Sequence, residues 1–248
     1  MANIVEEICG NARESMALGM TALAAMLTSV TPAAAEPLSP LAVGLLGSPA
    51  QSAPTAEKYA TPNNDVRFVL DRSNGAPLLR FDGSEEVLAL RATPGARGDE
   101  ILKTDTGHVL LRVTSLGGVI VYPDAKSAGA PASPVGPAKP LSAPVAPAGG
   151  LAAKLSAISA ATSKKLGRPI LFVAQSVPGA ISGVAAEAAQ LAADALVREQ
   201  GAGVARVVIL PGAAPATMRQ GDTLRVVVAA PLGYAGRPST AALTAAAR

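Results

Sequence analysis

His108 is the only histidine in the chain, and imidazole is the usual general base at neutral pH. A Ser-His-Asp hydrolase also needs a serine on a sharp, exposed turn, and the sequence has no G-x-S-x-G element. His108 directly follows the turn at residues 104–107, which is typical of an exposed position on a strand. We therefore keep His108 as a candidate ligand-binding residue and name no catalytic residue.

The segment at residues 233–240, GYAGRPST, has the most distinctive set of side chains. Its two glycines permit a tight, irregular backbone, on which Tyr234 and Arg237 could present an aromatic ring and a forked donor side by side. A structural interpretation is open as well, because Pro238 followed by Ser239 is typical of the start of a helix. Tyr234, Arg237 and Ser239 are therefore candidates for ligand binding or for fixing and capping the last helix.

The sequence predicts neither a metal site nor a cofactor. Cys9 is the only cysteine, and a single histidine with scattered carboxylates is a poor set of metal ligands. Asp71, Asp99 and Glu100 lie near predicted turns but alternate with arginines. That pattern predicts a salt-bridged, solvated face rather than a pair of catalytic carboxylates.

Composition limits the classes of partner. The chain has no tryptophan and only three residues each of phenylalanine and tyrosine, which argues against stacking surfaces for nucleic acid. Charge is uneven, with 8 basic and 11 acidic residues in 36–125 against 12 and 4 in 126–248. The basic second half could bind polyanions or contact a membrane surface, although scattered, solvated cations explain the same composition.

Residues 1–35 are predicted to be a signal peptide. An apolar run at 16–30 precedes Ala33-Ala34-Ala35, the small residues expected before a cleavage site, so the mature chain would begin at Glu36. The segment before the run is acidic, whereas a signal has a basic one. A buried N-terminal helix of a cytoplasmic protein is therefore the alternative. We expect a periplasmic or secreted protein.

Two proline-rich stretches divide the mature chain. Residues 36–65 and 125–150 carry proline at short intervals and few large apolar residues, which predicts solvated, mobile linkers. They separate an antiparallel β module at 66–124 from an α/β module at 151–248. The first module is small, so packing against the second would help its core.

The predicted fold class is α+β: a small antiparallel β meander, as a sandwich or partly open barrel, followed by a small mixed α/β module. Alternating apolar residues and glycine turns place six short strands in the first module. These strands are expected at residues 66–70, 78–81, 87–90, 101–103, 108–113 and 119–122.

Helical spacing of apolar residues places helices in the second module at 151–166 and 182–200, with Ser182 as the cap of the latter. Strands are expected at 169–174, 204–210 and 223–230, and a last short helix near Ser239. The first two strands should pair in parallel across the intervening helix, and the last two could form a hairpin.

Several short segments share a pattern with known sequences: FVLDR at 68–72, LRFDGSEEV at 79–87, RGDE at 97–100, LRVT at 111–114, GG at 117–118 and GYAGRPS at 233–239. They resemble an uncharacterised family of exported alphaproteobacterial proteins that carries only a domain-of-unknown-function label. The resemblance covers most of the mature chain and implies an exported bacterial protein. It brings no known activity, ligand or site.

We therefore expect a non-enzymatic protein of the bacterial envelope whose partner is an envelope component or another envelope protein. One alternative is a hydrolase-like enzyme with a site around His108 and the acidic first module. Another is a polyanion or membrane-surface binder that uses the basic second half, and a cleft where the two modules meet would be the place to look for a site.

Overall fold

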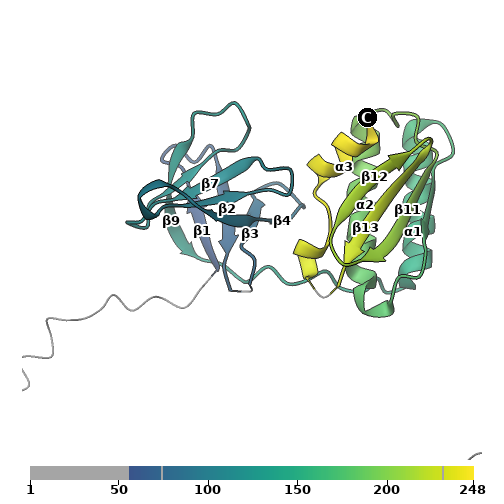
Figure 1. Ribbon diagram of the computed structural model, residues 1–248, viewed down its shortest axis with the longest axis horizontal. Coiled ribbons are helices and arrows are strands. Elements are labelled where there is room, and N and C mark those ends of the chain that lie inside the picture. The colour runs from purple at the N-terminus through teal and green to yellow at the C-terminus, as the bar shows by residue number, and fades with distance from the viewer. Residues whose placement is uncertain (1–55, 74, 231) are drawn as a thin grey trace, which may run out of the picture. The chain divides into compact units, whose positions relative to one another are not determined.

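The computed structural model describes residues 56–248 apart from 74 and 231, and all of them belong to one compact unit. The predicted signal peptide at 1–35 and most of the predicted linker at 36–65 lie outside the described residues. The fold is α+β, as expected: a large antiparallel sheet, a smaller mixed sheet and three α-helices (Figure 1). The assignment of 66–124 and 151–248 to separate modules stays a prediction.

Nine strands form the large sheet, in the spatial order β4-β3-β2-β1-β9-β8-β7-β6-β5. They are β1 (Ala56–Ala60), β2 (Arg67–Asp71), β3 (Leu78–Phe81), β4 (Leu88–Ala89), β5 (Arg91–Pro94), β6 (Glu100–Lys103), β7 (Val109–Val113), β8 (Val119–Val121) and β9 (Ala130–Pro137). The outermost strands, β4 and β5, are separated only by the buried Leu90, so the sheet curls back on itself and is nearly barrel-shaped. Its core is built from apolar side chains such as Phe68, Leu79 and Leu111.

Strand β9 corrects the prediction of a mobile linker at 125–150. Residues 130–132 pair with β8, and residues 133–137 pair with β1, so the strand changes neighbours half-way along its length. In each half of β9, one edge of the backbone has no neighbouring strand among the described residues. A proline whose nitrogen faces that edge removes no hydrogen bond between strands, because no acceptor strand lies there. The proline-rich composition of this segment therefore predicted a linker, although its pairing with two neighbouring strands makes residues 130–137 a strand. Strand β1 likewise occupies part of the predicted linker at 36–65.

The chain between β9 and the first helix is also held in place. The backbone N–H of Leu141 donates to Oδ2 of Asp71 at 2.6 Å, and both residues are buried. Further along, the backbone at Pro144 lies against Gly183, so closely that a Cβ on that glycine would be 2.3 Å from the carbonyl oxygen of Pro144. The connector therefore packs on both parts of the structure.

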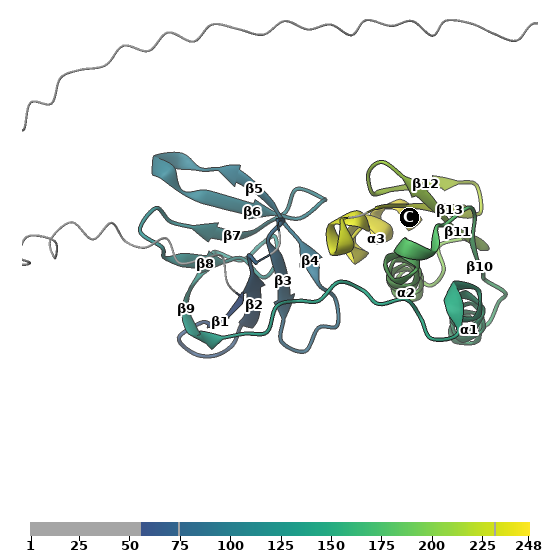
Figure 2. The same cartoon turned by 90° about the horizontal axis from the view of Figure 1, so that it is seen from below.

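The small sheet has the order β10-β11-β13-β12 and carries its helices on one face (Figure 2). Along the chain, α1 (Gly150–Leu166) leads to β10 (Leu171–Ala174), α2 (Ser182–Arg198), β11 (Arg206–Gly212), β12 (Ala216–Gln220), β13 (Thr223–Ala229) and α3 (Thr240–Ala247). As predicted, β10 and β11 are parallel. Gly167 takes the left-handed conformation at φ 66° and ends α1, in line with the predicted boundary.

Two expectations for the small sheet are wrong. The strands at 204–210 and 223–230 do not form a hairpin, because β12 lies between them in sequence and pairs antiparallel with β13, so β11 and β13 are parallel. Ser182 does not cap α2 either. Its hydroxyl donates to the carbonyl of Gly179, in the 3₁₀ turn Gly179–Ile181 that runs directly into the helix.

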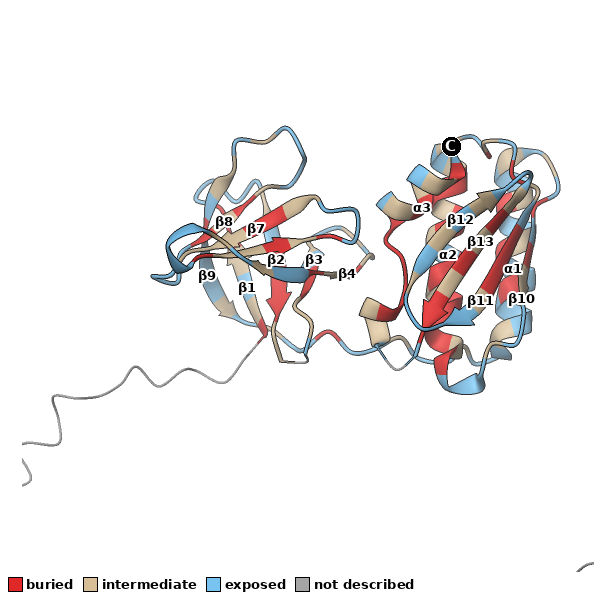
Figure 3. Cartoon of the chain, in the orientation of Figure 1, coloured by how far each residue is buried: buried red, intermediate tan, exposed pale blue. Residues whose placement is uncertain are grey.

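Helix α2 lies at the centre of the small sheet's core, against α1, α3, β11 and β13. In the described part of the chain, Gly179–Arg198 is the one segment long and apolar enough to cross a membrane, with a mean hydropathy of 1.3. Two thirds of it (67%) is buried inside the protein, largely through alanines (Figure 3). Burial of this kind is typical of a core helix.

Candidate functional site

The segment at 233–240 lies where the two sheets meet. Its first half is a 3₁₀ turn, Gly233–Gly236, and Gly233 has a φ of +52° that favours glycine. A Cβ on Gly236 would be 2.2 Å from the carbonyl oxygen of Ala229, so only glycine fits this close approach to the end of β13. The turn directs the side chain of Arg237 into the protein, and α3 begins three residues after Arg237.

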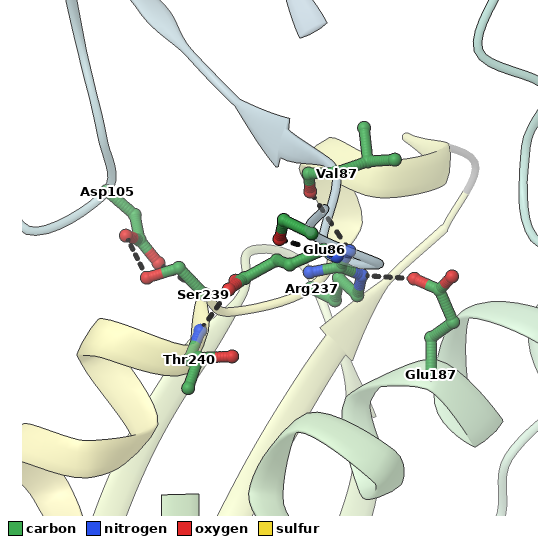
Figure 4. Close-up of polar contacts among 8 residues, drawn as sticks. Glu86, Val87, Asp105, Glu187, Arg237, Ser239 and Thr240 are labelled. Atoms are coloured by element: carbon green, nitrogen blue, oxygen red, sulfur yellow. Dashed lines mark hydrogen bonds and ion pairs between the residues drawn. The ribbon is translucent and has the colours of Figure 1, made fainter. Parts of the chain in front are cut away.

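Arg237 is buried where the two sheets meet, and its side chain is only 2% exposed. Its Nε donates to Oε2 of Glu187 on α2 at 2.7 Å, and its Nη2 donates to the carbonyl oxygen of Val87 at 3.0 Å (Figure 4). The guanidinium carbon lies 5.3 Å from the centre of the Tyr234 ring. Burial, together with the charge of Glu187, raises the pKa of Tyr234 above its ordinary value.

Two carboxylates of the large sheet satisfy the free N–H groups at the start of α3. Asp105 accepts from the backbone N–H of Ser239 at 2.8 Å and from its hydroxyl at 2.6 Å, and Glu86 accepts from the N–H of Thr240 at 2.8 Å (Figure 4). The Ser239 hydroxyl oxygen accepts in turn from the N–H of Ala242 at 3.2 Å. Ser239 therefore caps the helix, as the structural interpretation expected, and Asp105 and Glu86 lie at the positive end of the helix dipole.

A small cavity of about 130 Å³ lies beside these contacts. Tyr234, Arg237, Ser239, Asp105 and Arg91 are among the residues that line it. The structure thus brings three of the four candidate residues together. The polar groups of Arg237 and Ser239 described above already bond protein atoms, so the arrangement fastens one sheet to the other. We name Glu86, Val87, Asp105, Glu187, Arg237, Ser239 and Thr240 the junction.

His108, the fourth candidate, is half-buried and takes no part in the junction's hydrogen bonds. Its backbone N–H donates to the hydroxyl of Thr104 at 3.1 Å, which closes the preceding turn. Among the residues that the structure describes, its ring has no hydrogen bond or ion pair. The oxygen of Ser239 bonds Asp105 and the N–H of Ala242, so a Ser-His-Asp relay is not assembled in this arrangement.

Of the three acidic residues considered in the large sheet, Asp99 and Glu100 form ion pairs, but Asp71 and Asp99 are buried. Asp99 bonds Arg112 and Glu100 bonds Arg72, as the salt-bridged face predicts. The hydrogen bonds from Arg112 hold the pKa of Asp99 below its ordinary value. Asp71 is fully buried and the Asp99 side chain is 5% exposed, which corrects the expectation of a solvated face for both residues.

Asp71 accepts hydrogen bonds from the N–H and hydroxyl of Ser73 and from the N–H of Leu141. Burial by itself raises the pKa of this carboxyl. The bonds from Ser73 and Leu141 outweigh that effect, and the pKa lies below its ordinary value. Asp71 is therefore a charged structural link between β2 and the connector.

The sequence pointed to the residues of the 233–240 segment but not to the residues that contact this segment in the junction. Asp105, Glu86 and Glu187 were not singled out as partners of the 233–240 segment. They lie 134, 154 and 50 residues from the groups they bond. No periodicity or spacing relates residues so far apart in a single sequence, and an acidic residue in a turn has the pattern of an ordinary exposed side chain.

Within residues 56–248, apart from 74 and 231, one face of the small sheet carries no helix, and we call it the open face (Figures 1 and 2). Strand register places these residues on it: Leu171, Val173, Arg206, Val208, Leu210, Ala216, Met218, Gln220, Thr223, Arg225 and Val227. Leu171 is 47% exposed and Met218 is 54% exposed. The inward residues of the same strands, Phe172, Val207 and Leu224 among them, are buried against the helices.

A family model described as "Domain of unknown function (DUF4908)" matches residues 42–247. No curated protein and no solved structure matches the chain. The match covers both sheets and the whole junction.

Proposed function

We propose that this chain, which belongs to the DUF4908 family, is an exported, non-enzymatic interaction protein of the bacterial cell envelope. The observation that carries the proposal is the open face. A sheet in a folded domain normally has its apolar faces covered, and here Leu171 and Met218 are about half exposed on a face that no helix of the described part of the chain covers. An exposed apolar surface of this kind is more favourable when a partner protein covers it than when it stays in contact with water.

The junction supports the same proposal. Tyr234, Arg237 and Ser239 had the residue types of a ligand site, and they contact the large-sheet side of the structure instead: Arg237 and Ser239 through hydrogen bonds and Tyr234 through apolar packing. A buried ion pair, a capped helix and two further carboxylate–amide bonds make this attachment specific in geometry. A fixed junction presents the open face in a constant orientation, which is what a docking protein requires.

A polyanion binder is the second candidate, and the charge of the open face favours it. Arg206 and Arg225 both lie on this face, which carries no acidic residue. The two candidates differ in their response to salt. Polyanion binding depends on counterion release and falls steeply with ionic strength, whereas docking through apolar contact is retained.

The test is to follow the chain in its host bacterium. We expect the chain in the envelope fraction with Glu36 at its amino end, in a complex larger than the monomer on a native gel. Met218→Lys should release it from the complex, because a lysine there must be desolvated on docking.

Leu116→Lys is the matched control. Leu116 is 97% exposed in the turn between β7 and β8, and the same change there should leave the complex intact. A monomeric chain at native expression level would overturn the interaction role. Retention of the whole amino end in the cytosol would overturn export.

A further inference from the structure

The residues of the open face form rows across the four strands. In the middle row, Met218 lies opposite Arg225, Arg225 opposite Val208, and Val208 opposite Val173. The next row toward the carboxyl ends of the parallel strands pairs Val227 with Leu210 on one side and Ala216 on the other. These two rows make an apolar band that is interrupted only by Arg225.

The row at the opposite end is mixed, with the exposed Leu171 opposite Arg206, Arg206 opposite Thr223, and Thr223 opposite Gln220. Apolar side chains therefore reach both ends of the open face, while its two cations lie toward the end at which the parallel strands begin. Arg206 and Arg225 lie on neighbouring strands, one row apart. Arg225 donates to the amide oxygen of Gln220 at 3.3 Å, and within the described residues neither arginine has a carboxylate partner.

The opposite face of the same sheet indicates what shape of partner fits. There, α2 packs on β11 and β13 and buries apolar side chains, such as Val207 and Leu224, that alternate with those of the open face. A sheet with helices on both faces is a standard layer architecture, and an amphipathic helix on the open face would match α2 on the other side. A second helix layer would cover both faces of the sheet.

We infer that the open face is the docking site for an amphipathic helix of a partner protein, whose apolar stripe covers the band around Val227 and Met218 and whose carboxylates pair with Arg206 and Arg225. This inference rests on the proposed interaction function and adds the chemistry of the partner. Arginine forms bidentate pairs with carboxylates, and each pair would fix the direction of the helix along the sheet. The complementary charge also raises the rate of encounter.

The test uses the full chain and a synthetic amphipathic helical peptide of about 18 residues, long enough to hold a helix in water. Leucines at positions i, i+3, i+4 and i+7 form its stripe, and two glutamates lie in one terminal turn. A sister peptide has glutamine in place of both glutamates. Fluorescence anisotropy should show binding of the glutamate peptide, with the glutamine peptide weaker by about tenfold.

Two double variants of the protein locate the site. Arg206→Gln with Arg225→Gln should weaken the glutamate peptide by about tenfold and leave the glutamine peptide unchanged. Lys164→Gln with Lys165→Gln removes the same charge from exposed positions of α1, on the covered side of the sheet, and should change neither affinity. An equal loss in both double variants would mean general electrostatic attraction and would overturn the site.

The remaining outcomes separate this inference from the proposed function. Equal binding of both peptides, abolished by Met218→Lys, overturns the carboxylate pairing and leaves an interaction protein with an apolar docking face. Binding of anionic phosphatidylglycerol vesicles or heparin with no binding of either peptide overturns the helix and favours the polyanion candidate. Absence of binding to all four probes, with the envelope complex still lost in Met218→Lys, overturns a helical occupant while the interaction role stands.

Discussion

Arg237 and Glu187 form an ion pair across the core of the junction, with 2.7 Å between Nε and Oε2. The arginine side chain is 2% exposed and the glutamate side chain is 35% exposed. The cation is therefore almost completely desolvated, while its partner keeps part of its hydration. Removal of the glutamate leaves a buried charge without its counterion, which is the costlier way to break such a pair.

Glu187→Gln should lower the free energy of unfolding by about 1–2 kcal/mol. The amide oxygen can still accept from Arg237, so only the charge is lost, and the partial exposure of Glu187 keeps the cost at the lower end. Chemical denaturation measures the change. Glu199→Gln is the control, because the Glu199–Arg248 pair has an arginine that is 69% exposed. That variant should stay within about 0.5 kcal/mol of the wild type, and equal losses in both variants would contradict a special role for the junction pair.

Ser239→Ala should cost about 1–2 kcal/mol of stability. The hydroxyl both caps α3 through the N–H of Ala242 and donates to Asp105, so its loss loosens the helix start and the contact with the large sheet. Ser182→Ala removes a serine at the start of another helix, where the hydroxyl bonds only the carbonyl of Gly179. We expect that control to change stability by less than about 0.5 kcal/mol. Thermal denaturation of the two variants, side by side, checks the difference.

Local patterns in the sequence predicted those elements whose cause is local. The helix expected at 151–166 is α1 (Gly150–Leu166), because its apolar spacing and terminal glycine are both read within the segment. The last helix begins next to Ser239 for the same reason. Strand β9 was missed since its composition is that of a linker, and the cause of its strand conformation is pairing with β1 and β8.

The candidate site shows the same difference between features with a local cause and features that depend on distant parts of the chain. The 233–240 segment stood out by its residue types, and an antiparallel meander, as a sandwich or partly open barrel, was predicted together with the parallel pairing of β10 with β11. What the segment does depends on Asp105 and Glu187, which come from distant parts of the chain. Strand β12 was missed because five residues between two glycine turns read as a longer turn, and its pairing with β13 decides the order of the sheet.

Gly183→Ala should destabilise the protein although alanine is the better helix former. On α2 alone the change would gain about 1 kcal/mol. The added Cβ would be 2.3 Å from the carbonyl oxygen of Pro144, so the connector has to move away from the helix, at a cost of about 1–3 kcal/mol beyond that gain. Gly179→Ala is the matched control, since a Cβ there meets no atom within 4 Å. A stabilised Gly183→Ala protein would mean that the connector does not rest on α2.

Asp71 should make the stability of the protein sensitive to acid. Its folded pKa lies below the ordinary value of about 3.9, so the unfolded chain binds a proton more readily than the folded one as the pH falls. The stabilisation from this carboxylate is therefore complete above about pH 5 and is lost as the pH drops through the folded pKa. Urea denaturation between pH 7 and pH 2.5 measures the effect.

Asp71→Asn has no titrating group at this position, and its amide cannot accept all the hydrogen bonds from Ser73 and Leu141. The variant should be less stable than the wild type at pH 7, and the difference should shrink as the pH approaches 2.5 because only the wild type loses a charged link. Ser73→Ala removes one donor to the carboxylate and should give a smaller change with pH than the wild type shows. A difference between the wild type and Asp71→Asn that stays constant over the whole pH range would mean that the pKa of Asp71 is the same in the folded and the unfolded chain, and would contradict the charged link.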